Sequence, residues 1–316
     1  MADISLTASM RSNLLSLQQT QSLMDTTQER LSTGKKVNSA IDNPSSYYTA
    51  QSLTNRASDL SSLLDSMGQA VQTIQAANEG IEAITEFASQ AKAIANSAND
   101  TSDVDSIENY MKQFDEILEQ IDGIAKDSGY KGVNLLEKDQ ELKVVFNEDR
   151  SSSLTVKSDD ASSEGLGLHA ATGAWTSEAE KGNATKFKTN GKADAGAYVF
   201  NGDKVYEVKK NYDGTTNAVD FNTLVADGSL VETDYKLNDD KSKAIEVTIS
   251  KDKINTSITE VEDAVSKLRN MASVFGNNYS IVENREEFTE NLINVLEEGA
   301  DKLTLADMNE ESANML

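Results

Sequence analysis

Apolar residues near the start of the chain recur in an alternating 4,3 spacing, the pattern of a helix that packs along a narrow seam. Over residues 6–31, five of the seven seam positions are apolar, and the other two are Gln21 and Gln28. The apolar positions are Met10, Leu14, Leu17, Met24 and Leu31. Ser, Thr and Gln fill much of the remaining surface, so the isolated helix should be marginal. We expect a helix here that needs a partner helix.

A boundary follows this first helix. Gly34 and the basic pair Lys35 and Lys36 predict its end, because glycine and cations both favour helix C-termini. Asn43 and Pro44 predict the start of the next helix, with Asn43 as the N-cap and Pro44 in the first turn.

The second and third helices carry the same spacing. Nine of eleven seam positions between residues 53 and 88 are apolar, and Asn78 could set the register. Ala91, Ile94 and Ala95 extend the stripe to a predicted break at 96–103. All six seam positions of the third helix are apolar, namely Ile107, Met111, Phe114, Leu118, Ile121 and Ala125. This helix should end near Ser128 and Gly129.

The period then changes to two, which is typical of strands. Residues 142–146 and 154–156 alternate around the polar turn 147–152, which predicts a β-hairpin. Residues 158–240 contain short β-like runs between turns rich in Asn, Asp and Gly. The runs are 198–200, 205–208 and 230–232, and their turns are 201–202, 213–214 and 227–228. Ile245, Val247 and Ile249 form one more strand, so we expect a small β-rich insert.

The last long segment suggests the architecture. Thirteen of fifteen seam positions between residues 254 and 303 are apolar, with Glu286 and Thr289 as the exceptions. A helix of this length extends about 75 Å and cannot bury its seam against itself. Its natural partners are the second and third helices. The expected fold is mainly α, with long antiparallel coiled-coil-like helices from both chain ends, a β-hairpin and a small central β domain. A generic coiled coil fits the periodicity as well, but not the insert.

The amino-acid composition argues against several kinds of partner and site. A net charge of −24 argues against nucleic acid or an anionic membrane as the main partner. With no Cys and only His169, a metal site or a catalytic triad built on these residues is not expected. The acidic turns 147–149 and 238–240 do not match a calcium-binding loop. We expect no catalysis and no cofactor. The start of the chain lacks the pattern of a cleavable secretion signal, and no apolar run reaches 18 residues.

Four segments, in the same order along the chain, resemble bacterial flagellins. Residues 30–44, RLSTGKKVNSAIDNP, are similar to their N-terminal motif, and residues 5–31 resemble the start of the family. Residues 130–136, YKGVNLL, resemble the F-N-G-x-x-L-L turn after the third helix. Residues 306–315 resemble the C-terminal A-D-x-x-x-E-x-A-x-M pattern. Together the resemblance covers roughly residues 1–157 and 245–316.

The resemblance implies a structural subunit of the extracellular flagellar filament, the propeller for swimming. It divides the chain into an axial helix and linker (1–42), a helical core (43–157 and 245–305), a surface insert (158–244) and the start of a C-terminal axial segment (306–316). Implied partners are other copies of the chain, the type III export apparatus, an export chaperone and a cap protein. The alternatives are a hook–filament junction protein of the same family, and a stalk-borne adhesin that uses the insert.

By the same resemblance, the residues implied in subunit assembly lie at both chain ends. They are Met10, Leu14, Leu17, Met24, Arg30, Leu31, Asn38, Asp42, Asp307, Glu310 and Met315. Local capping is the simpler interpretation near the linker.

Two departures from the family lead to further expectations. Flagellins continue past the C-terminal pattern with another apolar helix, whereas this sequence stops at Leu316, so we expect a loosely ordered first seam and impaired filament formation. Many flagellins present an Arg-rich segment to a Toll-like receptor. The equivalent segment 87–96, with Gln90, Lys92 and Ile94, has no Arg, so we expect weak or no recognition.

Overall fold

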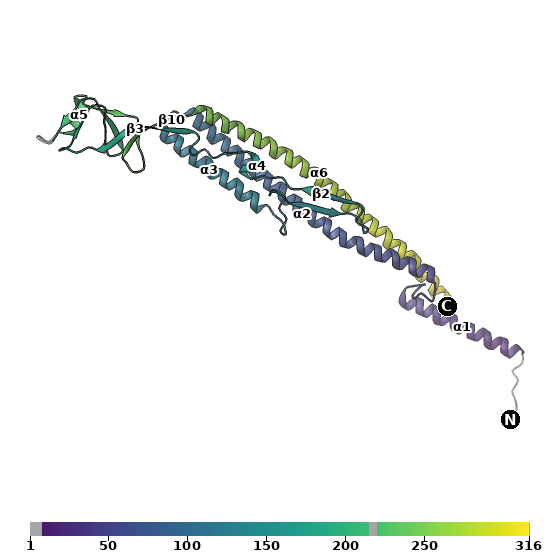
Figure 1. The fold of residues 1–316 in the computed structure, drawn as a ribbon. Helices are drawn as coiled ribbons and strands as arrows, with labels where there is room; N and C mark the ends of the chain where they lie inside the picture. Colours follow the sequence, from purple (N-terminus) through teal and green to yellow (C-terminus); the bar gives the residue numbers. More distant parts are fainter. Residues whose placement is uncertain (1–7, 215–219, 316) are drawn as a thin grey trace. The chain divides into compact units, whose positions relative to one another are not determined.

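The computed structural model describes residues 8–214 and 220–315, and its elements are drawn in Figure 1. The helices are α1 (Ala8–Thr33), α2 (Pro44–Asp100), α3 (Val104–Asp127), α4 (Ser163–Leu166), α5 (Phe221–Ala226), α6 (Lys251–Thr304) and α7 (Met308–Met315). The strands are β1 (Glu141–Val145), β2 (Ser153–Lys157), β3 (Thr176–Lys186), β4 (Lys192–Ala193), β5 (Tyr198–Asn201), β6 (Lys204–Val208), β7 (Tyr212–Asp213), β8 (Leu230–Thr233), β9 (Lys236–Leu237) and β10 (Lys243–Ile249). The mainly helical fold with a separate β-rich insert is confirmed.

The chain forms two compact units, and both α2 and α6 contribute to each of them. The first unit consists of residues 1–75, 141–157 and 275–316, and the second of residues 76–140 and 158–274. We describe each unit by itself.

In the first unit, α2 and α6 pack along the predicted seam. Asn43 caps α2, since its Oδ1 accepts a hydrogen bond from the Ser46 N–H at 3.1 Å. Ala57 and Leu60 of α2 form a buried cluster with Leu296 of α6. Thr289 is tolerated in the buried seam because its hydroxyl donates to the Arg285 carbonyl of its own helix at 2.8 Å.

The hairpin in this unit follows the predicted alternation. β1 and β2 pair antiparallel, with Leu142 opposite Val156 and Val144 opposite Leu154. Val144 and Val156 are buried, which places the apolar side of the ribbon inward. The prediction of a hairpin with a polar turn is therefore confirmed.

In the second unit, α3 buries all six predicted seam residues. Asp103 caps its N-terminus and Ser128 its C-terminus. The predicted break at 96–103 was too long, because α2 continues to Asp100. Ala95 and Ala98 are fully buried there, and the Lys251 ammonium donates to the carbonyls of Asn99 and Thr101 at the helix end.

One predicted feature of this seam was wrong. Asn78 was expected to set the register between helices, but its amide donates to Glu82 Oε1 of its own helix at 3.2 Å. That pair spans one helical turn, so it stabilises α2 locally.

Residues 159–175 attach to α3 before the insert begins. The Asp122 carboxylate accepts from the Ser163 N–H at 2.7 Å, and the Asp115 carboxylate from the Ala171 N–H at 2.6 Å. Trp175 is fully buried, 5.1 Å from the Phe114 ring between centroids, and its Nε1 donates to Ser257 Oγ at 2.9 Å. This segment therefore completes the helical packing, and the sheet starts only at β3.

The insert is built on a six-stranded sheet in the order β8-β6-β5-β3-β10-β9. β5, β6, β8 and β10 coincide with the predicted strands, and Gly202 and Gly228 adopt positive φ in the predicted turns. β3 was missed because its side chains are mostly polar and exposed. It is held by its neighbours, pairing antiparallel with β10 and parallel with β5.

Candidate assembly site at the two chain ends

The segment after α1 meets the segment after α6, so both terminal motifs meet in one place. Gly34 ends α1 with a φ of 70°, and its N–H donates to the Arg30 carbonyl at 2.7 Å. This left-handed conformation suits glycine and allows the chain to turn sharply.

Main-chain hydrogen bonds then join the two segments. The Lys36 N–H donates to the Thr304 carbonyl at 2.8 Å, and the Ala306 N–H to the Gly34 carbonyl at 3.0 Å. The Lys36 ammonium also donates to the Lys302 carbonyl at 2.9 Å. The carbonyls at a helix C-terminus have no partners within the helix, so the N-terminal motif caps the end of α6.

A partly buried ion pair links α1 to α7. Arg30 Nη1 lies 2.9 Å from Glu311 Oε1, and Glu311 is only 6% exposed. Glu310 was named as the candidate and is exposed, but the glutamate of the A-D-x-x-x-E-x-A-x-M pattern on residues 306–315 falls at Glu311, the residue that pairs here. The phase of α7 decides which glutamate faces α1, and Asp307 starts this helix by accepting from the Asn309 N–H at 2.9 Å.

The loop before α2 folds around Asp42. Its carboxylate accepts from the Ser39 N–H at 2.8 Å and the Asn38 N–H at 2.9 Å. These hydrogen bonds, that of Ser39 first, lower the pKa of Asp42 below its usual 3.8. The Asn38 amide donates to Glu29 Oε1 at 3.3 Å. Both predicted residues therefore have local partners, as the capping interpretation proposes.

An open, polar hollow of about 760 Å³ lies at this junction. Its charged lining residues are Glu29, Arg30, Lys35, Lys36, Asp42, Asp307, Glu310 and Glu311. Arg30 pairs with Glu311 there, whereas Lys36, Asp42 and Asp307 bond to main-chain groups, which is the arrangement of a structural joint.

The predicted seam of α1 is exposed in the single chain. Met10, Leu14, Leu17 and Met24 are between 47% and 69% exposed, whereas Leu31 near the junction is half-buried. Met315 at the end of α7 is also exposed. The junction thus brings together Arg30, Asn38, Asp42, Asp307 and Glu310, and leaves the apolar seam residues in contact with solvent.

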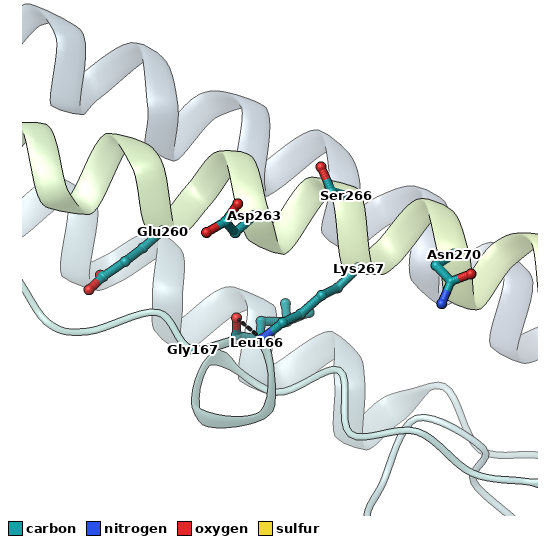
Figure 2. Close-up of a pocket in the computed structure, with 7 residues that line it drawn as sticks. All are labelled: Leu166, Gly167, Glu260, Asp263, Ser266, Lys267 and Asn270. Carbon is teal, nitrogen blue, oxygen red and sulfur yellow. Dashed lines mark hydrogen bonds between the residues drawn. The ribbon is translucent and has the colours of Figure 1, made fainter.

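A second hollow, in the other unit, has a structural explanation. Figure 2 shows Lys267 reaching from α6 to the turn after α4, where its ammonium donates to the Leu166 carbonyl at 2.8 Å. Gly167 ends that turn with a φ of 82°. Near this hollow of about 480 Å³, the exposed His169 lies 3.1 Å from Glu260 through Nδ1 and Oε1. In the described part of the chain, His and acidic residues form no cluster that could bind a metal ion.

The segment expected to face an innate receptor lies on α2. The Lys92 ammonium pairs with Glu262 Oε1 of α6 at 2.7 Å. Gln90 is exposed, and Ile94 is half-buried against α3 residues that line a shallow hollow. The one cation of this segment is thus bound within the chain.

The comparisons with known proteins agree with the terminal motifs. The family described as the bacterial flagellin N-terminal helical region matches residues 4–141. Flagellin FljK of Caulobacter vibrioides is 32% identical over 157 residues, which are 49% of this chain and 57% of the relative. These matches make the N-terminal part of the chain similar to bacterial flagellins. Flagellin C of Rhizobium meliloti is 22% identical over 303 residues, 92% of this chain and 84% of the relative.

Coverage differs among these relatives. The matches to the first three Caulobacter flagellins span only 57% to 62% of their length. The crystal structure of Bacillus cereus flagellin has a TM-score of 0.40 at 12% identity, covering 71% of this chain and 88% of that chain, which is too low to carry an argument. Within residues 8–214 and 220–315, no helix is long and apolar enough to cross a membrane.

Proposed function

We propose that this chain is a structural subunit that assembles with copies of itself into the flagellar filament. The observation that carries the proposal is the contrast within the first unit. The two terminal motifs are joined through polar contacts, while α1 next to them exposes a row of large apolar side chains. A row of exposed apolar side chains is typical of an interaction surface, and copies of the same chain can bury it.

Assembly then follows from mass action. Contacts that are repeated head to tail without closing generate a filament, and each contact stabilises the helices that make it. The charge of −24 keeps separate chains apart, so assembly should strengthen with salt. A torque-transmitting polymer needs no catalytic step, and this role is non-enzymatic.

The family also supports an extracellular location. We infer export through the flagellar type III apparatus, with an export chaperone and a cap protein as further partners. Lack of disulfides suits this route, because the chain must be unfolded for passage, and the sequence contains no Cys.

The decisive experiment is complementation of a motile bacterium that lacks its own flagellin. With the wild-type chain we expect filaments in electron micrographs, fewer than with a standard flagellin, and partly restored swimming. Leu17→Asp places a charge in the exposed seam and should abolish filaments. Gln19→Asp adds the same charge on another side of α1 and should leave them intact. Equal filament yields from both variants would refute the role of the seam.

A second test separates the filament role from the two alternatives. Only short assemblies would favour a junction protein. The Ser250 N–H donates to the Trp175 carbonyl at 2.8 Å, so a short glycine linker between these residues can replace the whole insert. Filaments that form without the insert but fail to adhere would favour an adhesin.

We further propose weak recognition by the Toll-like receptor, because Lys92 is already paired with Glu262. A receptor-reporter assay should give a weaker response than an Arg-rich flagellin. Glu262→Gln frees the Lys92 ammonium and should raise the response if this pairing matters. A wild-type response equal to the standard would contradict the proposal.

A further inference from the structure

The outer surface of α6 carries a second 4,3 stripe that the packing of the chain leaves uncovered. Ile281, Phe288 and Val295 recur every seven residues and are between 36% and 64% exposed. Each directly precedes a buried seam residue, namely Val282, Thr289 and Leu296. The stripe therefore lies about 100° around the helix from the buried seam.

Asparagines occupy the intervening positions of this stripe. Asn277, Asn284 and Asn291 alternate with the apolar residues and are exposed. Single exposed apolar residues are ordinary, but a heptad row with polar residues between is the pattern of a helix-packing seam. The Asn284 amide donates to the Ser280 carbonyl of its own helix at 2.6 Å, so Asn277 and Asn291 are the polar seam residues whose amides would need partners in the second copy, because an amide buried without a partner is costly.

A matching surface lies on α2 of the same unit. Its outermost stripe is exposed and mostly small and polar, and consists of Ser45, Tyr48, Ser52, Asn55, Asp59, Ser62 and Ser66. An open hollow of about 490 Å³ follows this stripe, with Tyr48, Ser52, Asn55 and Arg56 in its lining. The hollow can receive a large side chain, and its hydroxyl and amide groups can pair with asparagines.

Charge favours α2 over another α6 as the partner. Residues 281–298 contain six Glu and one Arg, a net charge of −5, so two such faces would repel each other. Residues 44–69 contain Arg56, Asp59 and Asp65, a net charge of only −1. Arg56 lines the hollow with Asp59 and Glu148 and pairs with Glu148 at 2.5 Å, so the lining has a net charge of −1, much less acidic than the α6 face.

We propose that the α6 stripe of one copy packs against the outer face of α2 in a second copy. This inference rests on the proposed function and identifies a contact that would build the polymer. The two faces differ, so the contact is heterologous and can be repeated from copy to copy, as a filament requires. A slip by one heptad would displace the copies by about 10 Å and put Ile281 or Val295 in the place of Phe288 against the α2 face.

Cysteine cross-linking tests the contact directly, since the native chain has no Cys. One copy carries Phe288→Cys, and a second copy with a different tag carries Ser52→Cys. Dioxygen with a copper catalyst oxidises the two thiols to a disulfide. We expect the mixed dimer to form at least tenfold faster than with Asn294→Cys, about 120° away on α6. Equal rates for both would overturn the proposal, as would faster pairing of Phe288→Cys with itself or with Leu17→Cys on α1.

Polymerisation in salt, started with seeds from sheared filaments, provides the second measurement. Phe288→Ser should raise the critical concentration about tenfold, while circular dichroism and Tm stay unchanged. Asn294→Ser should leave it unchanged. If the wild type never polymerises, the proposed function is refuted, but the cross-linking rates still test the contact between α6 and α2. If Phe288→Ser polymerises like the wild type, this inference fails alone.

Discussion

Removing the Arg30 guanidinium should detach α7 from α1 without unfolding the helical core. In Arg30→Ala, the Glu311 carboxylate would remain nearly buried with no cation at 2.9 Å. Breaking a fully buried pair costs about 3–5 kcal/mol, whereas exposed pairs contribute about 0–1 kcal/mol. The Arg30 side chain is 40% exposed, so water screens it, and we expect about 1–2 kcal/mol.

Hydrogen exchange resolves such a local change. The amides of Glu311 and its neighbours in α7 should exchange about 5- to 30-fold faster in the variant. The Tm should change little, because α7 has only eight residues and lies at the end of the fold. Arg11→Ala removes an exposed arginine from α1, the helix that also carries Arg30, and is the matched control.

A double variant tests whether the unpaired Glu311 charge causes the loss of protection. Arg30→Ala with Glu311→Ala removes the unpaired charge as well, so α7 should regain part of its protection relative to Arg30→Ala. Unchanged exchange in Arg30→Ala would show that the ion pair contributes nothing. A large fall in Tm would show that the junction is part of the cooperative core, and either result refutes the argument.

Three further predictions concern other parts of the chain. Gly80→Ala should lower the free energy of unfolding by about 1–3 kcal/mol, because the added Cβ would collide with Ser128 and Leu136. Gly123→Ala meets open space on α3 and should instead stabilise by about 0.5–1 kcal/mol, so equal effects in urea unfolding would contradict the packing. Trp175→Ala should cost about 3–5 kcal/mol by leaving a cavity beside Phe114, and a loss below 1 kcal/mol would mean that residues 159–175 are not part of the core. The lowered pKa of Asp42 means that its loop contacts are complete above the unfolded value of 3.8 and are lost as pH falls through the lower folded value. An NMR titration of the Ser39 amide should report this transition, and a midpoint above 3.8 would contradict it.

The sequence was sufficient wherever a single element carries its own pattern. The heptads of α3 identified all six buried residues, and Asn43 with Pro44 marked the start of α2. Alternation located the hairpin and four strands of the insert, because side-chain period is set by local backbone geometry. β3 escaped because its pattern is polar, and its pairing with β5 and β10 stabilises it from outside.

Only part of the candidate site could be predicted from the sequence, because its contacts join segments that are far apart in the chain. The two terminal motifs could be recognised in the sequence, and they supplied Arg30, Asn38, Asp42 and Asp307 as candidates. The C-terminal pattern places a glutamate at Glu311, but its pairing with Arg30 depends on how α7 packs against α1, and neither chain end contains that information alone.

By itself, then, the sequence determined which segments are helices and strands and which of their faces are apolar. The tertiary structure decided that the N-terminal loop caps α6 and that Glu311 meets Arg30. It also decided which apolar stripes are covered, since Leu296 is buried whereas Val295 beside it is exposed. Periodicity records which residues share a face, but only the packed chain shows whether that face already has a partner.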